Sequence, residues 1–390
     1  MEIMTYINQI IRSVLFKVGM KNNSAFTFDI KKVKQYVKSF PTPKDDIERS
    51  FYQYKCQMKL NGNFRKICLN FVSVPVLILC LLQCRKTKKS VESTKNAVFF
   101  PDGKPNNILP EEVRKNFEKV IYLSRSDTKK SLEKKDIKFI LGIWKRHPLS
   151  WLYVSKIAFK ISEYRYVINT YNPTAIIVCN EYSFTSSALT KFCNDNKIEH
   201  IDVMHGEKYY DMRDSFFRYN RCYVWDKYYE KLFIKLRADK NQFIVAIPES
   251  LIFKQMDISK THDYTYYLAD ENYKTLAVIA NELQILSKNN QVYIRPHPRY
   301  SNKEKVAKIF KNFEIEDCFK VSIEESILST KYAISLSSSA LNQAEHNGTI
   351  VIIDDISDGR RYKKLFELEY IGVRKPHLLL SHILSEQEGK

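Results

Sequence analysis

Two short motifs rich in hydrogen-bond donors follow apolar runs in the C-terminal half of the chain. Arg295-Pro296-His297-Pro298-Arg299 follows the run 291–294, and Ser337-Ser338-Ser339 follows the run 332–336. Short apolar runs bounded by polar or helix-breaking residues are typical of buried parallel strands. Ligands of parallel α/β sheets bind beyond the carboxyl ends of the strands, and both motifs stand at such ends. We therefore expect the two motifs to belong to one binding site.

The residue types in these motifs suit a phosphate group. We expect Ser338 or Ser339 to cap the helix that follows, so that hydroxyl groups and backbone N–H groups converge on one place. His297 stands between two prolines, and it could donate a hydrogen bond to the same phosphate or protonate a leaving group. The alternative interpretation is that the serines are only a helix cap and that His297 is only a loop residue.

The expected elements alternate between strands and helices, as in α/β proteins with parallel sheets. The candidate strands cover residues 97–100, 119–123, 175–179, 198–204, 222–225, 243–247, 264–268, 291–294, 319–321 and 332–336. This pattern predicts two Rossmann-like lobes with a cleft between them. The first lobe is expected to comprise residues 1–248, beginning with a helical extension, and the second to comprise residues 249–375. A helix at 377–384, within the last segment 376–390, is expected to pack back across both lobes.

Acidic and histidine side chains follow the expected strands of the first lobe. Glu181, His205 and Glu207 stand at two strand ends, and Asp102 follows the strand 97–100. A carboxylate or an imidazole there could act as a general base that removes the proton from an acceptor hydroxyl. The second lobe would meanwhile hold the phosphate of the leaving nucleotide. The alternative interpretation of each carboxylate is an ordinary helix cap or first-turn acid.

Composition narrows the classes of partner. The chain has 63 Lys and Arg residues against 44 Asp and Glu residues, and its net charge of +19 favours a nucleotide, a nucleic acid or a phospholipid headgroup. A nucleic-acid-binding protein is therefore one hypothesis. However, the basic residues are scattered and no RNA or DNA module is recognisable, so we expect no nucleic-acid partner. The eight cysteines form no CxxC pair, which indicates reduced cysteines in a cytoplasmic protein.

The most apolar segment is 67–82, and the basic run Arg85-Lys86-Thr87-Lys88-Lys89 follows it. Polar residues and a proline interrupt the segment, so we expect a buried helix rather than a membrane span. A membrane-surface element is the alternative, because an apolar segment beside basic residues suits an anionic leaflet. The opening segment through Lys17 is amphipathic but has no cleavage site, so no signal peptide is expected.

The motifs resemble those of bacterial sialyltransferases and other CMP-sugar-dependent glycosyltransferases of the GT-B fold. In that group the second lobe carries an HP motif and a later serine-rich motif, which His297-Pro298 and Ser337-Ser338-Ser339 match in order and placement over residues 264–354. The resemblance implies that His297 contacts or protonates the CMP phosphate and that the serines bind it, with Arg295 or Arg299 nearby. The group's acidic motif has two acids before a glycine, whereas this chain has Pro101-Asp102-Gly103, so the identity of the base stays open.

The resemblance implies an α/β protein of GT-B type with an acceptor-binding first lobe and a nucleotide-donor-binding second lobe. The expected activity is inverting, metal-independent transfer of sialic acid, a related nonulosonate or Kdo from a CMP donor to a surface glycan such as an O-antigen, a capsule or a lipooligosaccharide. No cofactor is expected beyond the CMP-sugar, which is the donor substrate. We expect a cytoplasmic enzyme, with peripheral association at the inner membrane face if the acceptor is lipid-linked.

A second enzyme class shares part of the pattern. His205-Gly206, together with the RPHP and serine motifs, is similar to the CDP-glycerol glycerophosphotransferases of wall-polymer synthesis. The alternative function is therefore a CDP-glycerol or CDP-ribitol phosphotransferase, in which a phosphoalcohol is transferred. In that case His205 is the expected base toward the acceptor hydroxyl.

Overall fold

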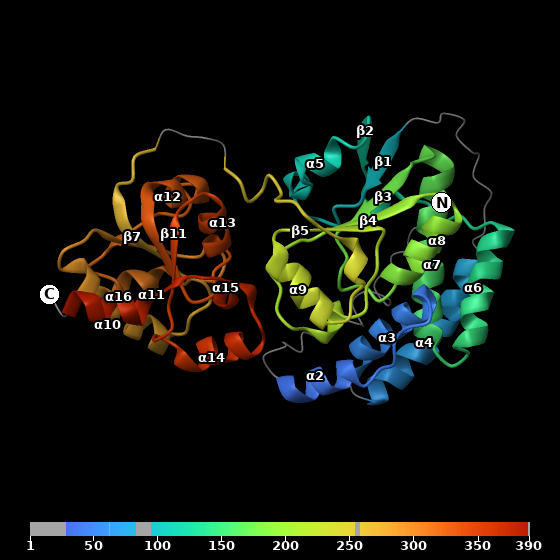
Figure 1. Ribbon diagram of the computed structural model, residues 1–390, viewed down its shortest axis with the longest axis horizontal. Helices are drawn as coiled ribbons and strands as arrows, with labels where there is room; N and C mark the ends of the chain where they lie inside the picture. The colour runs from blue at the N-terminus through green and yellow to red at the C-terminus, as the bar shows by residue number, and fades with distance from the viewer. Residues whose placement is uncertain (1–28, 62, 83–94, 254–257, 389–390) are drawn as a thin grey trace. The chain divides into compact units, whose positions relative to one another are not determined.

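A computed structural model describes residues 29–61, 63–82, 95–253 and 258–388 (Figure 1). The chain forms two units. The first comprises the described chain up to His205 together with Tyr210–Ala246, and the second comprises Gly206–Tyr209 together with the described chain from Ile247 onward. The amphipathic opening segment and the basic run 85–89 lie outside the described residues.

The first unit is built on a parallel sheet of six strands in the order β2-β1-β3-β4-β5-β6. The strands are β1 (Asn96–Phe99), β2 (Lys119–Tyr122), β3 (Ala175–Val178), β4 (Glu199–Val203), β5 (Arg221–Val224) and β6 (Phe243–Val245). Small and β-branched residues from neighbouring strands form the core, among them Ala97, Ala175 and Ile201. The chain reverses its direction of winding between β1 and β3, so the ends of these two strands form the topological switch point of the sheet.

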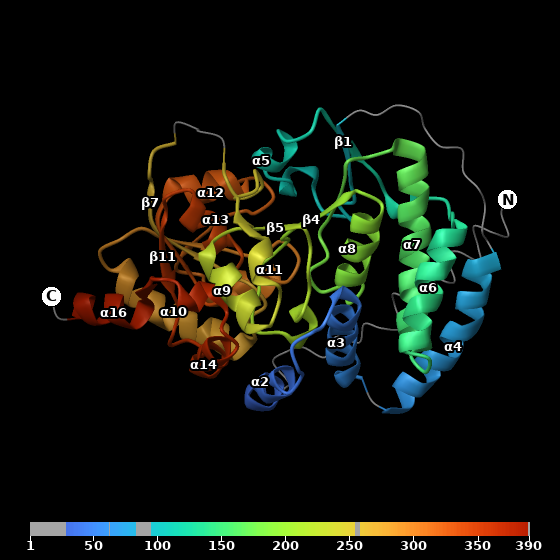
Figure 2. The same ribbon diagram turned by 45° about the vertical axis from the view of Figure 1, so that its right-hand side comes forward.

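Helices surround this sheet. They are α2 (Ile30–Lys38), α3 (Asp46–Lys59), α4 (Asn63–Leu82), α5 (Glu111–Arg114), α6 (Lys134–Arg146), α7 (Trp151–Tyr171), α8 (Ser186–Asp195) and α9 (Lys227–Lys235), with short 3-10 helices at Asn106–Ile108, Arg125–Asp127, Met212–Asp214 and Lys240–Gln242. Most of α7 is buried, because α4, α6 and α8 all pack against it (Figures 1 and 2). Helix α7 is therefore the central helix of the unit.

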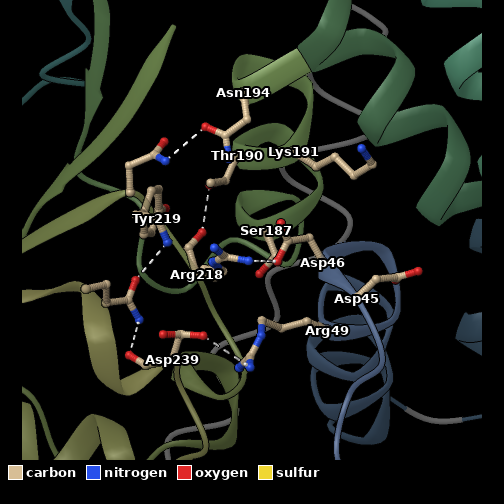
Figure 3. A network of polar contacts seen from close by, with 12 residues as sticks. Asp45, Asp46, Arg49, Ser187, Thr190, Lys191, Asn194, Arg218, Tyr219 and Asp239 are labelled. Carbon is tan, nitrogen blue, oxygen red and sulfur yellow. Dashed lines mark hydrogen bonds and ion pairs between the residues drawn. The ribbon is translucent and has the colours of Figure 1, made fainter. Parts of the chain in front are cut away.

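Ion pairs tie the N-terminal extension to this unit. In Figure 3, Asp46 of α3 lies 2.8 Å from the Nη1 atom of Arg218, and Arg49 lies 3.6 Å from the Oδ2 atom of Asp239. The carbonyl of Arg218 also accepts a hydrogen bond of 2.8 Å from Thr190 of α8. Helix α3 is thus attached both to α8 and to the segments around β5.

The second unit contains another parallel sheet, with the strand order β12-β11-β10-β7-β8-β9. The strands are β7 (His262–Tyr267), β8 (Val292–Arg295), β9 (Glu314–Ile315), β10 (Thr330–Ser335), β11 (Ile350–Ile353) and β12 (Leu378–Leu379). Counted from β7, this is the 3-2-1-4-5-6 order of a dinucleotide-type Rossmann sheet. The switch point lies between β7 and β10.

Helices cover both faces of the second sheet (Figures 1 and 2). They are α10 (Tyr273–Ser287), α11 (Lys303–Ile309), α12 (Ile323–Ser329), α13 (Ala340–His346), α14 (Gly359–Glu367), α15 (Ile371–Arg374) and α16 (Leu380–Glu388). Alternate strand residues enter two separate cores: Ile334 and Ile352 pack with α10, while Ala333 and Ile353 pack with α13. This alternation explains why the strands read as continuous apolar runs.

The two sheets confirm the predicted fold class, an α/β protein of GT-B type with two Rossmann-like lobes. The strand expected at 319–321 is wrong. Asp317 forms a turn there, accepting hydrogen bonds from the backbone N–H groups of Phe319 and Lys320, and the strand lies earlier, at Glu314–Ile315. The last helix begins at Leu380 because Leu378–Leu379 first pair with β11, and the helix packs Leu380 and Leu384 into the core of the second unit.

The apolar segment 67–82 forms a helix, α4, but the expectation that it is buried is wrong. Within the described chain, α4 is the one helix long and apolar enough to cross a membrane, and only 28% of its most apolar 18-residue window is buried. Leu69, Val76 and Leu77 face inward. The opposite face is apolar as well as exposed.

Candidate functional site

Three loops of the second unit follow the ends of the neighbouring strands β7, β10 and β11. Asp270 follows β7, the serine triplet follows β10, and Asp354 follows β11. In this strand order the ends of β7 and β10 flank the switch point, where Rossmann sheets bind nucleotides. The structure therefore places the serine triplet at the part of the sheet best suited to a nucleotide phosphate.

Arg361 of α14 connects the two sides of this switch point. Its Nη2 atom lies 2.7 Å from the Oδ1 atom of Asp270 and donates a hydrogen bond of 3.1 Å to the Oγ atom of Ser337. The side chain is 28% exposed, so a ligand could reach it. A guanidinium beside a hydroxyl group is a strong donor set for phosphate.

The three serines differ in their surroundings. Ser338 is buried: its backbone N–H donates to Ser335, and its hydroxyl accepts a hydrogen bond of 3.3 Å from the backbone N–H of Ala340. Ser339 occupies the N-cap position of α13 but makes no side-chain cap bond, and it is exposed. Ser337 contacts Arg361. The accessible hydroxyl groups are therefore those of Ser337 and Ser339, whereas Ser338 shapes the loop.

The hydrogen bonds of His297 determine which of its ring nitrogens carries the proton. Nδ1 accepts from the backbone N–H groups of Arg299 at 3.0 Å and of Tyr300 at 3.3 Å. Nδ1 must therefore hold a lone pair, so the proton of the neutral ring is on Nε2. Burial and the nearby Arg299 lower the pKa of His297, against the opposing effect of Asp270. His297 is thus built as a neutral N–H donor rather than as a proton donor to a leaving group.

Of the other residues of the RPHP motif, Arg295 is paired within the protein, whereas the expected donor-binding role of Pro298 and Arg299 stays a prediction. The guanidinium of Arg295 is buried, pairs with Glu316 and donates a hydrogen bond of 2.9 Å to the carbonyl of Val321. Arg295 therefore anchors the loop after β9. Its guanidinium is occupied by these contacts, which does not fit the phosphate ligand expected from the sequence. Pro298 and Arg299 are exposed in the turn that holds His297.

In the first unit the structure brings Glu181 and His205 together. Glu181 follows β3, is fully buried, and places its Oε2 atom 2.9 Å from Nδ1 of His205; its Oε1 atom accepts a hydrogen bond of 3.1 Å from the His205 backbone N–H. The two atoms lie within ion-pair distance, although the geometry forms no hydrogen bond between them. A carboxylate this close to Nδ1 favours a proton there, which would leave the lone pair on Nε2, as in a histidine base beside an acid.

Helix α3 holds the loop that carries Glu181. Gln53 donates a hydrogen bond of 2.9 Å to the carbonyl of Glu181, Gln57 donates to that of Tyr182, and Ser50 donates one of 2.6 Å to that of Phe184. Side chains of one helix therefore satisfy three carbonyl groups of an irregular loop. The position of Glu181 depends on the N-terminal extension.

Asp102 lies at the end of β1, within the same unit. Its backbone is left-handed (φ 51°), and its carboxylate lies 2.7 Å from Nε of Arg125 and accepts a hydrogen bond of 3.1 Å from Asn180. Burial alone would raise the pKa of Asp102, but Arg125, Lys160 and the hydrogen bonds hold it below its usual value. Asp102 is a permanently ionised partner of Arg125, which does not suit a base that must exchange protons.

Glu207 belongs to the second unit. Tyr370 donates a hydrogen bond to its Oε2 atom, and burial raises the pKa of Glu207 to about 8, although Lys375 opposes the shift. Burial and the hydrogen bond from Tyr370 thus favour the protonated carboxyl group, and the role of Glu207 as a base stays a prediction.

Sequence reasoning missed Arg361. It lies 22 residues after the serine triplet, in α14, the helix that follows β11. No local motif marks it. The available signal was the basic pair Arg360-Arg361 just after the acidic strand end Asp354-Asp355. Such a basic pair can be assigned to the binding site only when the strand order is known.

Comparison with known proteins gives no family. No family model and no curated protein matches the chain. Among solved structures, a putative UDP-N-acetylglucosamine 2-epimerase from Listeria monocytogenes is 11% identical, with a TM-score of 0.42 over 70% of this chain and 82% of that chain. The wall teichoic acid polymerase TagF is 10% identical, with a TM-score of 0.41 over 86% of this chain and 87% of that chain. The calicheamicin glycosyltransferase CalG4 is 8% identical, with a TM-score of 0.41 over 71% and 84%. TM-scores below 0.5 assign no function to this chain.

We expect Glu207→Gln to remove a pH dependence of stability. The carboxyl ionises near pH 4.5 in the unfolded chain and near pH 8 in the folded one, so its stabilising contribution is complete below about pH 4.5 and is lost as the pH rises to about 8. The amide cannot ionise. The melting temperature of Glu207→Gln, measured by calorimetry, should therefore exceed that of the wild type by roughly 2–4 °C at pH 8 and match it at pH 5.

The exposed Glu304→Gln in α11 is the control, since its melting temperature should follow the wild type at both pH values. A Glu207→Gln protein that is less stable than the wild type at pH 8 would show that Glu207 is ionised and paired in the folded state.

Proposed function

We propose that the protein is a glycosyltransferase that moves a sugar from a CMP donor to a hydroxyl group of a glycan. The observation that carries the proposal is the donor set at the switch point of the second sheet, with Arg361 hydrogen-bonded to Ser337 and ion-paired with Asp270. The loop of His297 follows the neighbouring strand β8, and its Nε2–H is a further donor. One guanidinium, one imidazole N–H and hydroxyl groups suit the single phosphate of CMP.

The proposed reaction needs a base, and we assign that role to His205, whose Nδ1 atom lies 2.9 Å from the Glu181 carboxylate. The acceptor oxygen attacks the anomeric carbon while the bond from that carbon to the phosphate oxygen breaks, and CMP leaves with the electron pair. His205 takes the acceptor proton on Nε2, and Glu181 stabilises the imidazolium that forms. The donors of the second unit stabilise the charge that develops on the leaving phosphate.

The finer assignment comes from the resemblance of the HP and serine motifs. It supports cytosine as the base of the nucleotide. It also supports sialic acid, a related nonulosonate or Kdo as the sugar, transferred with inversion and without a metal. The acceptor is then a surface glycan such as an O-antigen, a capsule or a lipooligosaccharide. The cleft expected between the lobes stays a prediction, as does a cytoplasmic location.

A second candidate is the CDP-alcohol phosphotransferase. The observation that favours it is that the oriented base is His205, which is the base expected in that class, rather than a lone carboxylate. In this reaction the acceptor oxygen attacks phosphorus and CMP again leaves. The donor contains a diphosphate, so a preference for CDP over CMP distinguishes the two candidates.

We expect Arg361→Gln to weaken nucleotide binding. The melting temperature and the heat of binding should be followed on titration with CMP, CDP, UDP, GDP and ADP, with and without EDTA. A hydrogen bond to a charged group contributes about 1.5–3 kcal/mol, so the affinity for the preferred nucleotide should fall about 10- to 100-fold in Arg361→Gln. The neighbouring, exposed Arg360→Gln has the same loss of charge and should bind as the wild type does.

Selective binding of CMP that EDTA does not change supports the glycosyltransferase, and selective binding of CDP supports the phosphotransferase. If no cytidine nucleotide binds, both candidates are wrong. Equal affinities of the Arg361→Gln and Arg360→Gln proteins would remove Arg361 from the donor site.

We expect His205→Asn to separate chemistry from donor binding. General-base catalysis contributes roughly 10²- to 10⁴-fold, so turnover, measured as CMP release in the presence of acceptor, should fall by that factor. The affinity for the nucleotide should stay unchanged, because His205 is not part of the donor set. The exposed His382→Asn of α16 serves as a control with normal turnover. Normal turnover of His205→Asn would exclude His205 as the base.

A further inference from the structure

A cavity of about 680 Å³ opens in the first unit at the ends of β1 and β3. This is the switch point of the first sheet, the place where a doubly wound sheet is expected to bind a ligand. Cavities of this size hold small organic molecules. Asp102 and Tyr182 are among the residues that line it, whereas Glu181 and His205 are not.

The polar part of the cavity wall carries excess positive charge. Four cationic side chains line it, from Lys104, Arg125, Lys156 and Lys160, against the two carboxylates of Asp102 and Glu163. Glu163 is fully enclosed by cations: Lys130 lies at 2.7 Å, Arg125 at 3.2 Å and Lys160 at 3.7 Å. The carboxylates hold these cations in position, and the excess of positive charge remains for a ligand.

The charged form of two lysines is disfavoured in this structure. Burial, and then the nearby Arg125, lowers the pKa of Lys160 to about 7, and burial lowers that of Lys156 to about 8. An anionic group in the cavity would stabilise both ammonium groups. The remaining wall is largely apolar, with Leu123, Leu152 and Phe184.

We propose that this cavity binds a small molecule in which a phosphate or carboxylate group is joined to an apolar or ring-shaped part. Arg125, Lys156 and Lys160 hold the anionic group, and the apolar wall holds the rest. The binding itself does not depend on the proposed reaction. The role of the ligand rests on the proposed function: it is the acceptor, because His205 packs its ring edge against Tyr182, a wall residue, with ring centres 5.5 Å apart.

The test uses phenyl phosphate and inorganic phosphate as probes. Binding should be measured by calorimetry at constant ionic strength in the full-length Arg361→Gln protein, so that the phosphate site of the second unit does not contribute. Both probes should bind, phenyl phosphate more tightly. Adding Lys160→Met or the less buried Lys156→Gln should weaken binding about tenfold or more, because a charged donor is lost.

Lys130→Met is the matched control, since Lys130 contacts the same Glu163 carboxylate but does not line the cavity. It should keep most of the affinity. Equal losses in all three variants, or no binding of either probe to a protein whose melting is normal, would overturn the proposal. Failure of the nucleotide screen would leave this result intact, so the two proposals can fail separately.

The exposed face of α4 carries an independent inference. Its large exposed apolar side chains all fall on one side of the helix when successive residues are turned by about 100°. They are Phe64, Ile67, Phe71, Val72, Ile78, Leu79 and Leu82. Phe64, Phe71 and Leu82 are 81%, 72% and 75% exposed. We call these residues the α4 face; at 1.5 Å per residue it is about 30 Å long.

The other side of α4 is fixed to the protein. The hydroxyl of Ser155 in α7 donates a hydrogen bond of 2.8 Å to the carbonyl of Ser73, and Asn70 bonds to the carbonyl of Leu149 and the N–H of Leu152. A helix that crossed a membrane would have to give up these contacts. The geometry therefore suits a helix that lies on a bilayer rather than one that spans it.

The charged residues of α4 indicate which kind of surface the α4 face binds. The α4 sequence has Arg65 and Lys66 at its start and no charged residue from 67 to 82. Positive charge beside an apolar face matches a bilayer with anionic headgroups. We infer that the α4 face docks onto such a membrane.

The experiment is co-sedimentation of the full-length protein with vesicles of phosphatidylcholine alone or mixed with phosphatidylglycerol. Binding should require the anionic lipid and weaken at high salt. The double variant Phe71→Ser, Ile78→Ser should reduce the bound fraction about fivefold or more, because both side chains are exposed and their loss should not disturb folding.

The double variant Phe319→Ser, Ile252→Ser is the matched control, since these side chains of the second unit are 66% and 49% exposed, close to the 72% of Phe71 and the 52% of Ile78. It should bind as the wild type does. Unchanged binding of the Phe71→Ser, Ile78→Ser protein would overturn the inference. So would a concentration-dependent dimer in lipid-free solution that this variant abolishes, because the α4 face would then cover a second copy of the chain.

Discussion

A carboxylate without exposed surface has to be paired, and the pairing of Glu181 with His205 determines much of the first unit's functional geometry. Glu181 stands at the end of β3 and His205 follows the end of the neighbouring strand β4, so the contact joins two adjacent strand ends. The loop after Glu181 has no regular structure of its own, and its carbonyl groups are satisfied by α3. Helix α3 is in turn fixed by Asp46 and Arg49. The N-terminal extension is therefore part of the site's support, because without it the buried acid would lose the backbone geometry that keeps it against the histidine.

The two candidate histidines, His205 in the first unit and His297 in the second, have different surroundings at Nδ1, and this difference follows from local backbone geometry. At His297 two backbone N–H groups point at Nδ1, so Nε2 carries the proton. At His205 a carboxylate lies 2.9 Å from Nδ1 without forming a hydrogen bond, and it favours a proton on Nδ1 and a lone pair on Nε2. A histidine that donates a hydrogen bond to a leaving phosphate needs a proton on Nε2. A histidine that acts as a base toward an acceptor needs a lone pair there. The same residue type thus supports two roles because the turn of the RPHP motif supplies donors and the end of β3 supplies an acceptor.

The sequence predicted the α/β class and the strand-end placement of the motifs, because buried parallel strands appear as apolar runs whatever their order. It did not predict that order, since strand pairing is long-range, and without it Arg361 could not be assigned to the site. Arg295 was misjudged because its charge suggested a ligand, while its partner Glu316 lies on the next strand connection. The wrong strand at 319–321 reflects the turn that Asp317 imposes on an apolar pair. Burial of α4 was misjudged because a segment that is apolar on every face reads as core, and only the fold shows which face has no partner.

Helix α7 relates the cavity of the first unit to the α4 face. Leu152, Lys156 and Lys160 follow one another at four-residue spacing and line the cavity, whereas Ser155 and Ser162 lie on another side of the helix and contact α4. Helix α7 therefore lies between α4, which carries the α4 face, and the cavity of the first unit, whose wall is partly cationic and partly apolar. A ligand with an anionic group and a long apolar part could use both, with its polar end in the cavity and its apolar end in the bilayer beneath α4. The two inferences together favour a lipid-linked acceptor, because the α4 face would hold the protein at the bilayer in which the apolar part of such an acceptor is anchored.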